Sequence, residues 1–289
     1  MQTDMEDYSR IDLSLWQQVG EGGNGKTYVN PSEPGKILKV NNSRSSDLES
    51  VRKEFNQSKA VEGLGLPTPA MYEIVRVADA FGVLSQLVRN KKSLSRICHD
   101  EPQRTAEMAR LLARLGKEFF STPCDTSFFP SRRQQALKAC EIATYISLKK
   151  RQRIRDFVES IPERTTCLHG DFQPGNVIMA EGKCYWIDLG RFAYGDPMFD
   201  VGHLYQICQL YAPLPQVQNI FHMTLEQFHE FWDAFAKEFS GKEDHAEFDA
   251  QAGRFAAIDL ILRPVFLKPS LPEKIFFRIY VNRLMKRFY

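Results

Sequence analysis

The residues best suited to chemistry form a short polar segment near the middle of the chain. It reads His169-Gly170-Asp171-Phe172-Gln173-Pro174-Gly175-Asn176, and Asp188-Leu189-Gly190 begins twelve positions after Asn176. Phosphoryl transfer needs a carboxylate that accepts a hydroxyl proton, and oxygen ligands for Mg²⁺. Asp171 can supply the first, and Asn176 and Asp188 the second, because magnesium prefers few protein oxygens beside phosphate and water. In the alternative interpretation these residues only form the turns of a hairpin. The joint spacing of three polar residues favours chemistry.

A glycine cluster early in the chain is suited to binding phosphate, and its sequence allows two interpretations. Gly20, Gly22, Gly23 and Gly25 would let the backbone approach a phosphate closely. Residues 20–27, GEGGNGKT, also satisfy the P-loop pattern G-x-x-x-x-G-K-[ST]. A P-loop opens a helix, but the following TYVNPSEPGKILKV is β-branched and holds two prolines. We therefore expect a glycine loop between two strands.

The elements around these motifs divide the chain into two unlike parts. Residues 12–90 are rich in β-branched residues bounded by Gly, Pro and Asn, with one polar helix over 45–64. Beyond residue 100 the pattern is mostly helical, with Met108, Leu112 and Phe119 on one helix face. Further helical stretches are expected at 131–160, 198–213, 224–240, 245–262 and 271–288.

We predict an α+β fold with two lobes. The first, residues 1–90, is a small antiparallel β-rich lobe that binds the nucleotide phosphates. The second, residues 91–289, is helical and holds a catalytic hairpin over 163–190 and the acceptor site. The link falls near residues 88–95, and small ligands usually bind in clefts between such domains.

The motifs carry a family resemblance. HGDFQPGN followed by IDLGRFAYGDPMFDVGHL resembles the signature of the aminoglycoside phosphotransferase and choline kinase-like family: H-G-D-x-x-x-x-N, then D-x-G, then G-D-P-x-x-D. The resemblance covers about residues 12–210 and is most specific in the second lobe. It implies a protein-kinase-like fold, ATP and Mg²⁺ as cofactors, Asp171 as catalytic base, and Asn176 and Asp188 as metal ligands. It also implies that Asp200 is structural and caps or anchors the following helix.

The same resemblance assigns roles in the first lobe. Lys39, in KILKV, is similar to the strand lysine that contacts the α/β-phosphates. Glu54 is its expected ion-pair partner, and Glu49 is a weaker candidate. Gln86, Leu87 and Val88 would offer backbone groups to adenine.

Composition excludes little. Of the 289 residues, 43% are apolar and 26% charged, and the formal net charge is only +2, so nothing demands nucleic acid or an anionic membrane. The first residues, MQTDMEDYSR, lack the features of a signal peptide, and no apolar run approaches the roughly 20 residues that span a bilayer. Six scattered cysteines without a C-x-x-C pair favour free thiols and a cytoplasmic location.

The sequence therefore predicts an ATP-dependent kinase that phosphorylates a hydroxyl of a small molecule similar to an aminoglycoside, choline or a sugar. A protein kinase is disfavoured, since Gly170 replaces the loop arginine and few residues separate Asp188 from GDPMFD. A nucleotide-binding regulatory module without catalysis also stays open. Residues 226–249 carry eight acidic residues and two lysines, which either attract a cationic acceptor or simply face water or the basic C-terminal stretch. The acceptor and the oligomeric state stay undetermined.

Overall fold

The computed structural model describes residues 8–22, 25–41, 47–266 and 269–289. The chain divides into two compact units. The first comprises Met1–Lys91 with Ile178–Gly190, and the second comprises Lys92–Val177 with Arg191–Tyr289. The helix and strand content of the two units is the α+β organisation that the sequence predicts.

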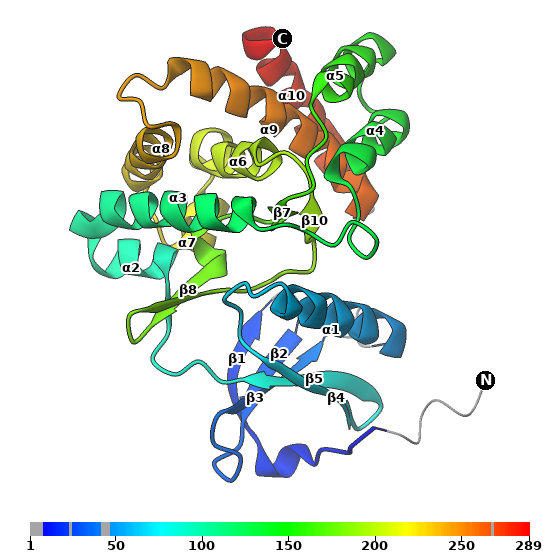
Figure 1. Cartoon of the computed structure of the whole chain (residues 1–289), viewed down its shortest axis with the longest axis vertical. Coiled ribbons are helices and arrows are strands. Elements are labelled where there is room, and N and C mark those ends of the chain that lie inside the picture. Colours follow the sequence, from blue (N-terminus) through cyan, green and yellow to red (C-terminus); the bar gives the residue numbers. More distant parts are fainter. Residues whose placement is uncertain (1–7, 23–24, 42–46, 267–268) are drawn as a thin grey trace. The chain divides into compact units, whose positions relative to one another are not determined.

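The first unit is built on an antiparallel sheet of five strands in the order β1-β2-β3-β5-β4 (Figure 1). The strands are β1 (Gln17–Gly22), β2 (Gly25–Val29), β3 (Lys36–Asn41), β4 (Met71–Val77) and β5 (Ala80–Gln86), preceded by a 3₁₀ turn, Leu13–Leu15. Helix α1 (Leu48–Gly63) packs on the sheet and begins at Asp47, whose carboxylate accepts the Ser50 amide. This is the helix predicted over 45–64.

Alternation along the strands gives the sheet two apolar faces. Leu38 and Leu84 pack with Trp16 on one face, whereas Val83 packs with Val51 of α1 on the other. Since neighbouring strand residues point to opposite faces, burial of Leu38 turns Lys39 to the face that α1 covers. The core packing of β3 thus fixes the side on which its lysine lies.

A hairpin from later in the chain completes the first unit. Strands β8 (Val177–Ala180) and β9 (Lys183–Trp186) are neighbours in a sheet and are joined through Glu181 and Gly182, which both have positive φ. Ile178 and Ala180 pack on Val88, and the Trp186 amide donates to the Pro67 carbonyl at 2.8 Å. These contacts explain why residues 178–190 group with the first unit, whereas the sequence analysis assigned the whole hairpin to the second lobe.

The second unit is mainly helical. Its helices are α2 (Leu94–Asp100), α3 (Thr105–Ser121), α4 (Arg132–Ile142), α5 (Leu148–Ser160), α6 (Met198–Tyr205), α7 (Pro215–Phe221), α8 (Leu225–Ser240), α9 (Ala246–Phe266) and α10 (Leu271–Phe288). Short elements add β6 (Lys92–Ser93), the antiparallel pair β7 (Cys167–Leu168) and β10 (Ala193–Tyr194), and the turns η2 (Pro102–Arg104), η3 (Pro174–Asn176) and η4 (Gln206–Tyr211). Figure 1 shows α9 lying among α4, α6 and α10, with which it packs.

Two helices differ from the sequence prediction for physical reasons. The stretch 131–160 is broken into α4 and α5, because the connection buries Ala143 and Ile146 in the core. Helix α9 was expected to end at residue 262 but continues through Pro264 to Phe266. Pro264 has no N–H for the carbonyl four residues earlier. That carbonyl, of Leu260, instead accepts the hydroxyl of Tyr145 at 3.2 Å.

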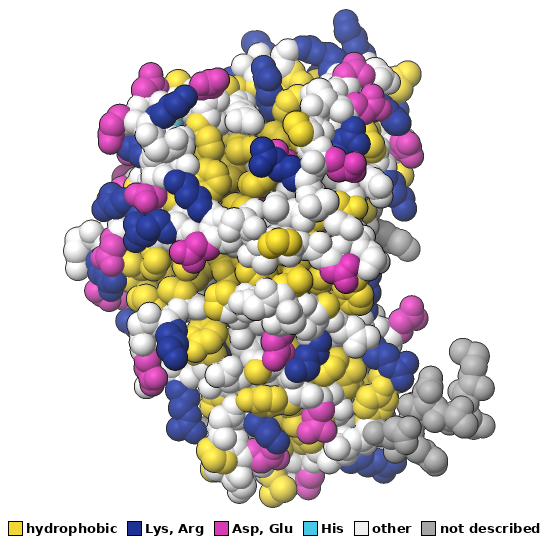
Figure 2. Space-filling model, in the orientation of Figure 1, with side chains coloured by type: hydrophobic (Ala, Val, Ile, Leu, Met, Phe, Trp, Pro, Cys, Tyr) yellow, Lys and Arg dark blue, Asp and Glu magenta, His cyan; other side chains and the backbone are white. Residues whose placement is uncertain are grey.

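All six cysteines are free thiols, as the sequence analysis expected. Among the helices of the described residues, none combines the length and the apolar character that a membrane crossing requires. Figure 2 shows basic and acidic side chains interspersed over the face in view.

Candidate active site

The polar segment around Asp171 is an ordered loop fixed from two sides. The Asp200 carboxylate, on α6, accepts the amides of His169 at 2.6 Å and Gly170 at 2.9 Å. The Phe172 ring is fully buried against Phe120 and Phe235. A charged acceptor and an apolar anchor therefore hold the backbone on either side of Asp171. The resemblance implied that Asp200 caps or anchors the following helix, whereas its carboxylate anchors the loop that holds Asp171.

Gly170 allows this loop to approach its neighbour closely. Its φ is +82°, and a Cβ there would lie 2.0 Å from the carbonyl oxygen of Arg191. Any side chain would clash with backbone, since real contacts are far longer. The loop arginine of protein kinases therefore has no room at this position of the chain.

Asn176 holds the Asp171 side chain in place. Its Nδ2 donates to the Asp171 backbone oxygen at 2.8 Å and to Asp171 Oδ2 at 3.0 Å. The turn η3 sets this distance, and the Gln173 side chain caps it by accepting the Gly175 amide at 2.8 Å. Because the amide nitrogen is turned to Asp171, the carbonyl oxygen of Asn176 faces away and is the atom suited to a cation.

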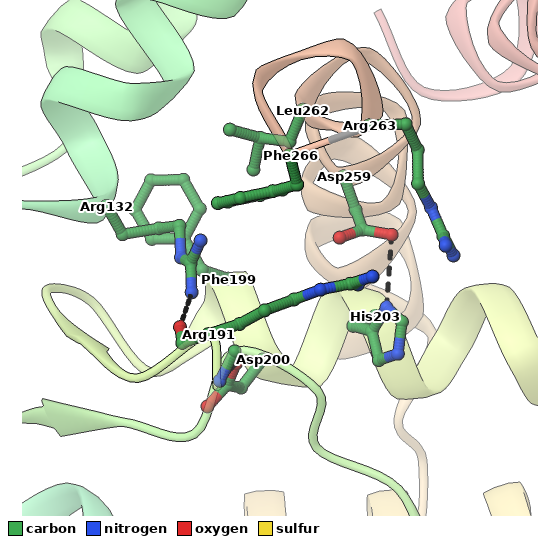
Figure 3. Close-up of a pocket in the computed structure, with 10 residues that line it drawn as sticks. Arg132, Arg191, Phe199, Asp200, His203, Asp259, Leu262, Arg263 and Phe266 are labelled. Carbon is green, nitrogen blue, oxygen red and sulfur yellow. Dashed lines mark hydrogen bonds and ion pairs between the residues drawn. The ribbon is translucent and has the colours of Figure 1, made fainter. Parts of the chain in front are cut away.

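A buried histidine, which the sequence analysis missed, touches Asp171 from the other side. His203 Nε2 lies 2.9 Å from Asp171 Oδ1, a distance typical of an ion pair although the two groups are not aligned as a hydrogen bond. His203 Nδ1 lies 3.1 Å from Asp259 Oδ2 on α9 (Figure 3). His203 follows Asp200 by one helical turn, so both face the loop. The three-residue spacing between Asp200 and His203 was a sequence signal for the histidine. The sequence contains no such signal for Asp259, which lies 56 residues after His203.

His203 and its two neighbouring aspartates, Asp171 and Asp259, each stabilise the charged form of the other. Burial favours neutral imidazole, but the carboxylates of Asp259 and Asp171 raise the pKa of His203 to about 9. Burial disfavours a charged Asp259, yet His203 lowers the pKa of that carboxyl to about 2. Burial likewise opposes ionisation of Asp171, and the positive charge of His203 outweighs it, so the pKa of Asp171 lies well below its usual range. Asp171 is therefore a carboxylate, able to accept a proton, throughout the neutral range.

The first unit contributes its own set of charged residues. Lys39 Nζ on β3 lies 2.6 Å from Glu54 Oε1 on α1, which is the pairing that the sequence analysis expected. Asn41 Nδ2, two residues along β3, donates to the other carboxylate oxygen of Glu54 at 3.2 Å. Glu54 is thus held by two residues of one strand, and Asn41 is a member of this set that the sequence analysis overlooked.

The glycine loop lies between strands. Gly20 and Gly22 are on β1 and Gly25 begins β2, whereas Gly23 lies outside the described residues. A Cβ on Gly25 would lie 2.3 Å from the Val40 carbonyl, so this position requires glycine. Lys26 is a strand residue, and its Nζ lies 3.8 Å from Glu21 Oε2. No helix begins there, which rules out the P-loop interpretation.

Four further candidates are in the first unit. Gln86 and Leu87 donate their amides to the carbonyls of Ala70 and Gly35, each at 2.8 Å. Of the expected adenine-binding segment, Val88 is then the residue best placed to offer an amide to a nucleotide. Asp188 follows β9 with a left-handed φ of +61°, a conformation that aspartate tolerates better than most residues.

Comparisons with known proteins agree with the motifs. A family model of the APH phosphotransferase enzyme family matches residues 16–239. The chain belongs to this family. The resemblance drawn from the loop motifs is thereby confirmed. No curated protein matches the sequence.

Solved structures of the same fold include several kinases. A thermostable mutant of the aminoglycoside phosphotransferase APH(4)-Ia, in ternary complex with AMP-PNP and hygromycin B, is similar over 94% of this chain and 93% of its own, with a TM-score of 0.62 and 14% identity. The amicoumacin kinase hAmiN, in complex with AMP-PNP, Ca²⁺ and Ami, is similar over 97% and 90%, with a TM-score of 0.60 and 12% identity.

A choline/ethanolamine kinase family protein from Mesorhizobium loti is similar over 94% of this chain and 88% of its own, with a TM-score of 0.57 and 10% identity. At these identities the likenesses show the fold alone. They confirm the predicted two-lobed, protein-kinase-like fold.

Proposed function

We propose that this chain is an ATP:alcohol O-phosphotransferase that phosphorylates a hydroxyl group of a small molecule. The observation that carries the proposal is the Asp171 carboxylate, held by Asn176 at 3.0 Å and by His203 at 2.9 Å within a loop anchored on Asp200. A carboxylate fixed in this way can orient a hydroxyl and accept its proton. These are the roles that the base has in phosphoryl transfer to an alcohol.

The reaction follows from these residues. The acceptor oxygen attacks the γ-phosphorus of ATP, its bond to phosphorus forms, and the bond from the γ-phosphorus to the β,γ-bridging oxygen breaks. ADP leaves, and the hydroxyl proton passes to Asp171. Lys39, held by Glu54 at 2.6 Å, would contact the phosphates. AMP-PNP in two of the similar structures supports ATP as the donor.

The types of the two residues expected to bind metal also suit magnesium. Asn176 offers its carbonyl oxygen, because its amide nitrogen is engaged by Asp171. Asp188 would supply the second protein oxygen. Two oxygen ligands are what Mg²⁺ takes from protein when phosphates and water complete its shell. Bound there, the ion would neutralise charge on the phosphates.

The alternatives have weaker support. A protein kinase would need an arginine before the catalytic aspartate, and Gly170 has no room for one. A regulatory module without catalysis is expected to have lost part of the motif, and Lys39, Asp171, Asn176 and Asp188 are all present. The similar structures contain hygromycin B or Ami as small molecules. These structures support a small-molecule acceptor for the proposal, but at 12–14% identity they do not identify it.

A screen for acceptor-dependent ADP release tests the proposal. The panel contains aminoglycosides, choline, ethanolamine, fructosamines, homoserine, thiosugars and hydroxy acids, with ATP and Mg²⁺ in every well. We expect at least one acceptor to raise ADP release above the rate without acceptor, and Asp171→Asn to abolish that increase. Tight binding of ATP and Mg²⁺ with no stimulation by any acceptor would instead favour the regulatory module.

A further inference from the structure

A narrow pocket in the second unit opens beside the catalytic loop. Gly170, the residue before Asp171, lines it together with residues of α4, α6 and α9 and with Arg191 (Figure 3). His203, which also lines it, lies 2.9 Å from Asp171. His203 therefore joins the pocket to Asp171, the side chain expected to meet the acceptor hydroxyl. The pocket's inner space of about 10 Å³ is no more than one water molecule requires, so a larger group would bind at its mouth.

The pocket has an excess of positive charge. Its lining includes Arg132, Arg191 and Arg263, and His203 adds a fourth cation because its pKa is raised. Only Asp200 and Asp259 oppose them. Even when Asp171 is counted with these two aspartates, one positive charge is left over. Buried charge is costly unless it is paired.

The pocket carboxylates are already engaged elsewhere. Asp200 accepts two loop amides, and Asp259 pairs with His203. Among the residues that the structure describes, none of the three arginines forms an ion pair with a carboxylate. Arg132, which is only 3% exposed, donates to neutral acceptors, the Gln135 side chain and the Arg191 carbonyl. The arginines are thus available to an anion that comes from outside the chain.

Arg263 is the clearest case of an unsatisfied donor. Its Nε is buried and has no hydrogen-bond acceptor within the described part of the chain. The hydroxyl of Tyr211, whose pKa burial raises and the Arg263 charge lowers, is buried and unpaired as well. Buried N–H and O–H groups are nearly always hydrogen-bonded in folded proteins. Two such groups beside one charged pocket indicate a ligand with acceptor oxygens.

The arginines are also held in position. The Phe266 ring lies 5.4 Å from the Arg132 guanidinium and 5.5 Å from that of Arg191, within the range of cation–π contacts. Figure 3 shows Arg191 extending across the pocket toward His203 and Asp259. A fixed, planar guanidinium suits the oxygens of a carboxylate or phosphate.

The acidic stretch 226–249 offers a weaker alternative. Four of its eight carboxylates are paired within the stretch, among them Asp233 with Lys237 and His245, and Glu247 with Lys242. A cationic acceptor would have to displace these partners. Within the described part of the chain, the pocket arginines form no ion pair with a carboxylate that an anion would have to displace, and only the His203 side chain separates the pocket from Asp171.

We propose that the acceptor is an anionic alcohol, and that its carboxylate or phosphate group binds at the mouth of the pocket against Arg191 and Arg263, which are both partly exposed. This inference rests on the proposed function for the transfer step. The hydroxyl of the same molecule then reaches Asp171, which takes its proton as the oxygen bonds to the γ-phosphorus and ADP leaves. The product carries the new phosphoryl group in addition to its original anionic group.

Matched probes test the charge requirement directly. Binding is followed by the thermal unfolding midpoint at constant ionic strength, with millimolar glycerate, glyceramide, glycerol or glycerol 3-phosphate. These probes share a hydroxyl-bearing carbon skeleton and differ in charge. Glycerate or glycerol 3-phosphate should raise Tm, and the one that does so distinguishes a carboxylate from a phosphate. Glyceramide and glycerol should leave Tm unchanged.

Variants locate the site. Arg263→Gln and Arg191→Gln each remove one charged donor and should weaken anion binding about 10- to 100-fold, as expected for a hydrogen bond to a charged group. Arg263→Lys keeps the charge and should retain part of the affinity. Arg110→Gln, an exposed arginine on α3, should bind as the wild type does.

The inference is wrong if glyceramide stabilises the protein as well as glycerate does, if neither anion binds, or if both pocket variants bind anions normally. Acceptor-dependent ADP release separates it from the proposed function. The wild type could bind anions, lose this binding in Arg263→Gln and yet turn over no acceptor. That result would support the anion site and contradict the kinase assignment. Turnover confined to neutral or cationic acceptors would support the kinase assignment and contradict the anion site.

Discussion

Replacing His203 should destabilise the second unit strongly. The imidazolium lies between Asp171 at 2.9 Å and Asp259 at 3.1 Å, and it is only 3% exposed. His203→Gln keeps the approximate size but leaves two half-buried carboxylates without their cation. Removing one partner of a buried ion pair costs about 3–5 kcal/mol. The pKa of His203, about 9 against 6.5 for an ordinary histidine, corresponds to roughly 3 kcal/mol at about 1.36 kcal/mol per pKa unit.

The assay can report the second unit alone. Of the three tryptophans, only Trp232 belongs to that unit, where it is buried and donates to Asp249 at 2.9 Å. In a Trp16→Phe/Trp186→Phe background, its fluorescence follows urea unfolding of this unit at neutral pH. We expect His203→Gln to lower the free energy of unfolding by about 3–5 kcal/mol. The exposed His229→Gln should stay within about 0.5 kcal/mol of the parent.

A double mutant separates charge from packing. Asp259→Asn removes one of the two carboxylates that His203→Gln leaves without a cation. The double variant should therefore lose less stability than the sum of the two single losses, by about 1–3 kcal/mol. A His203→Gln loss below about 1 kcal/mol, or strictly additive losses, would refute the assignment of His203 as the buried cation of this site.

The remaining predictions concern nucleotide binding and pH. Lys39→Ala should lower the turnover rate strongly and Lys26→Ala only slightly, because only Lys39 is held by Glu54. Steady-state rates in which Lys26→Ala is the slower variant would contradict this prediction. Asp188→Asn should weaken binding of ATP with Mg²⁺ in calorimetry but leave metal-free ADP binding unchanged; equal losses of both would argue against a metal ligand. His203 has a folded-state pKa raised to about 9 from 6.5, so its stabilisation is complete below pH 6.5 and lost as pH rises through about 9. The difference in free energy of unfolding between wild type and His203→Gln should therefore shrink as the pH rises from 6.5 to about 9. A difference that grows over this range would contradict the raised pKa of His203.

The sequence was most informative where the functional residues are close together along the chain. Asp171 and Asn176 are five positions apart in one loop, so their spacing alone predicted that they belong to one site. The lack of helix-forming residues after Lys26 likewise predicted a strand rather than a P-loop helix. Local sequence chemistry decides such features, and no distant contact changes them.

Features that depend on distant contacts were not predictable in the same way. His203 and Asp259 meet only because α6 packs on α9, and no sequence pattern pairs these two residues. The arginine pocket combines Arg132 with Arg263, from helices more than a hundred residues apart. Helix α9 passes Pro264 because Tyr145, from another segment, satisfies the freed Leu260 carbonyl. Each case turns on a tertiary partner that single-sequence periodicity does not contain.

The most direct test of the account is phosphorus NMR of the reaction. Wild-type protein with ATP, Mg²⁺ and an acceptor from the screen should produce ADP and a new phosphomonoester in equal amounts. Asp171→Asn, which is nearly isosteric, should lower this rate by roughly 10²–10⁴ while nucleotide affinity stays almost unchanged. Full phosphomonoester formation by Asp171→Asn, or release of inorganic phosphate alone by the wild type, would contradict the assignment of Asp171 as the base of an alcohol phosphotransferase.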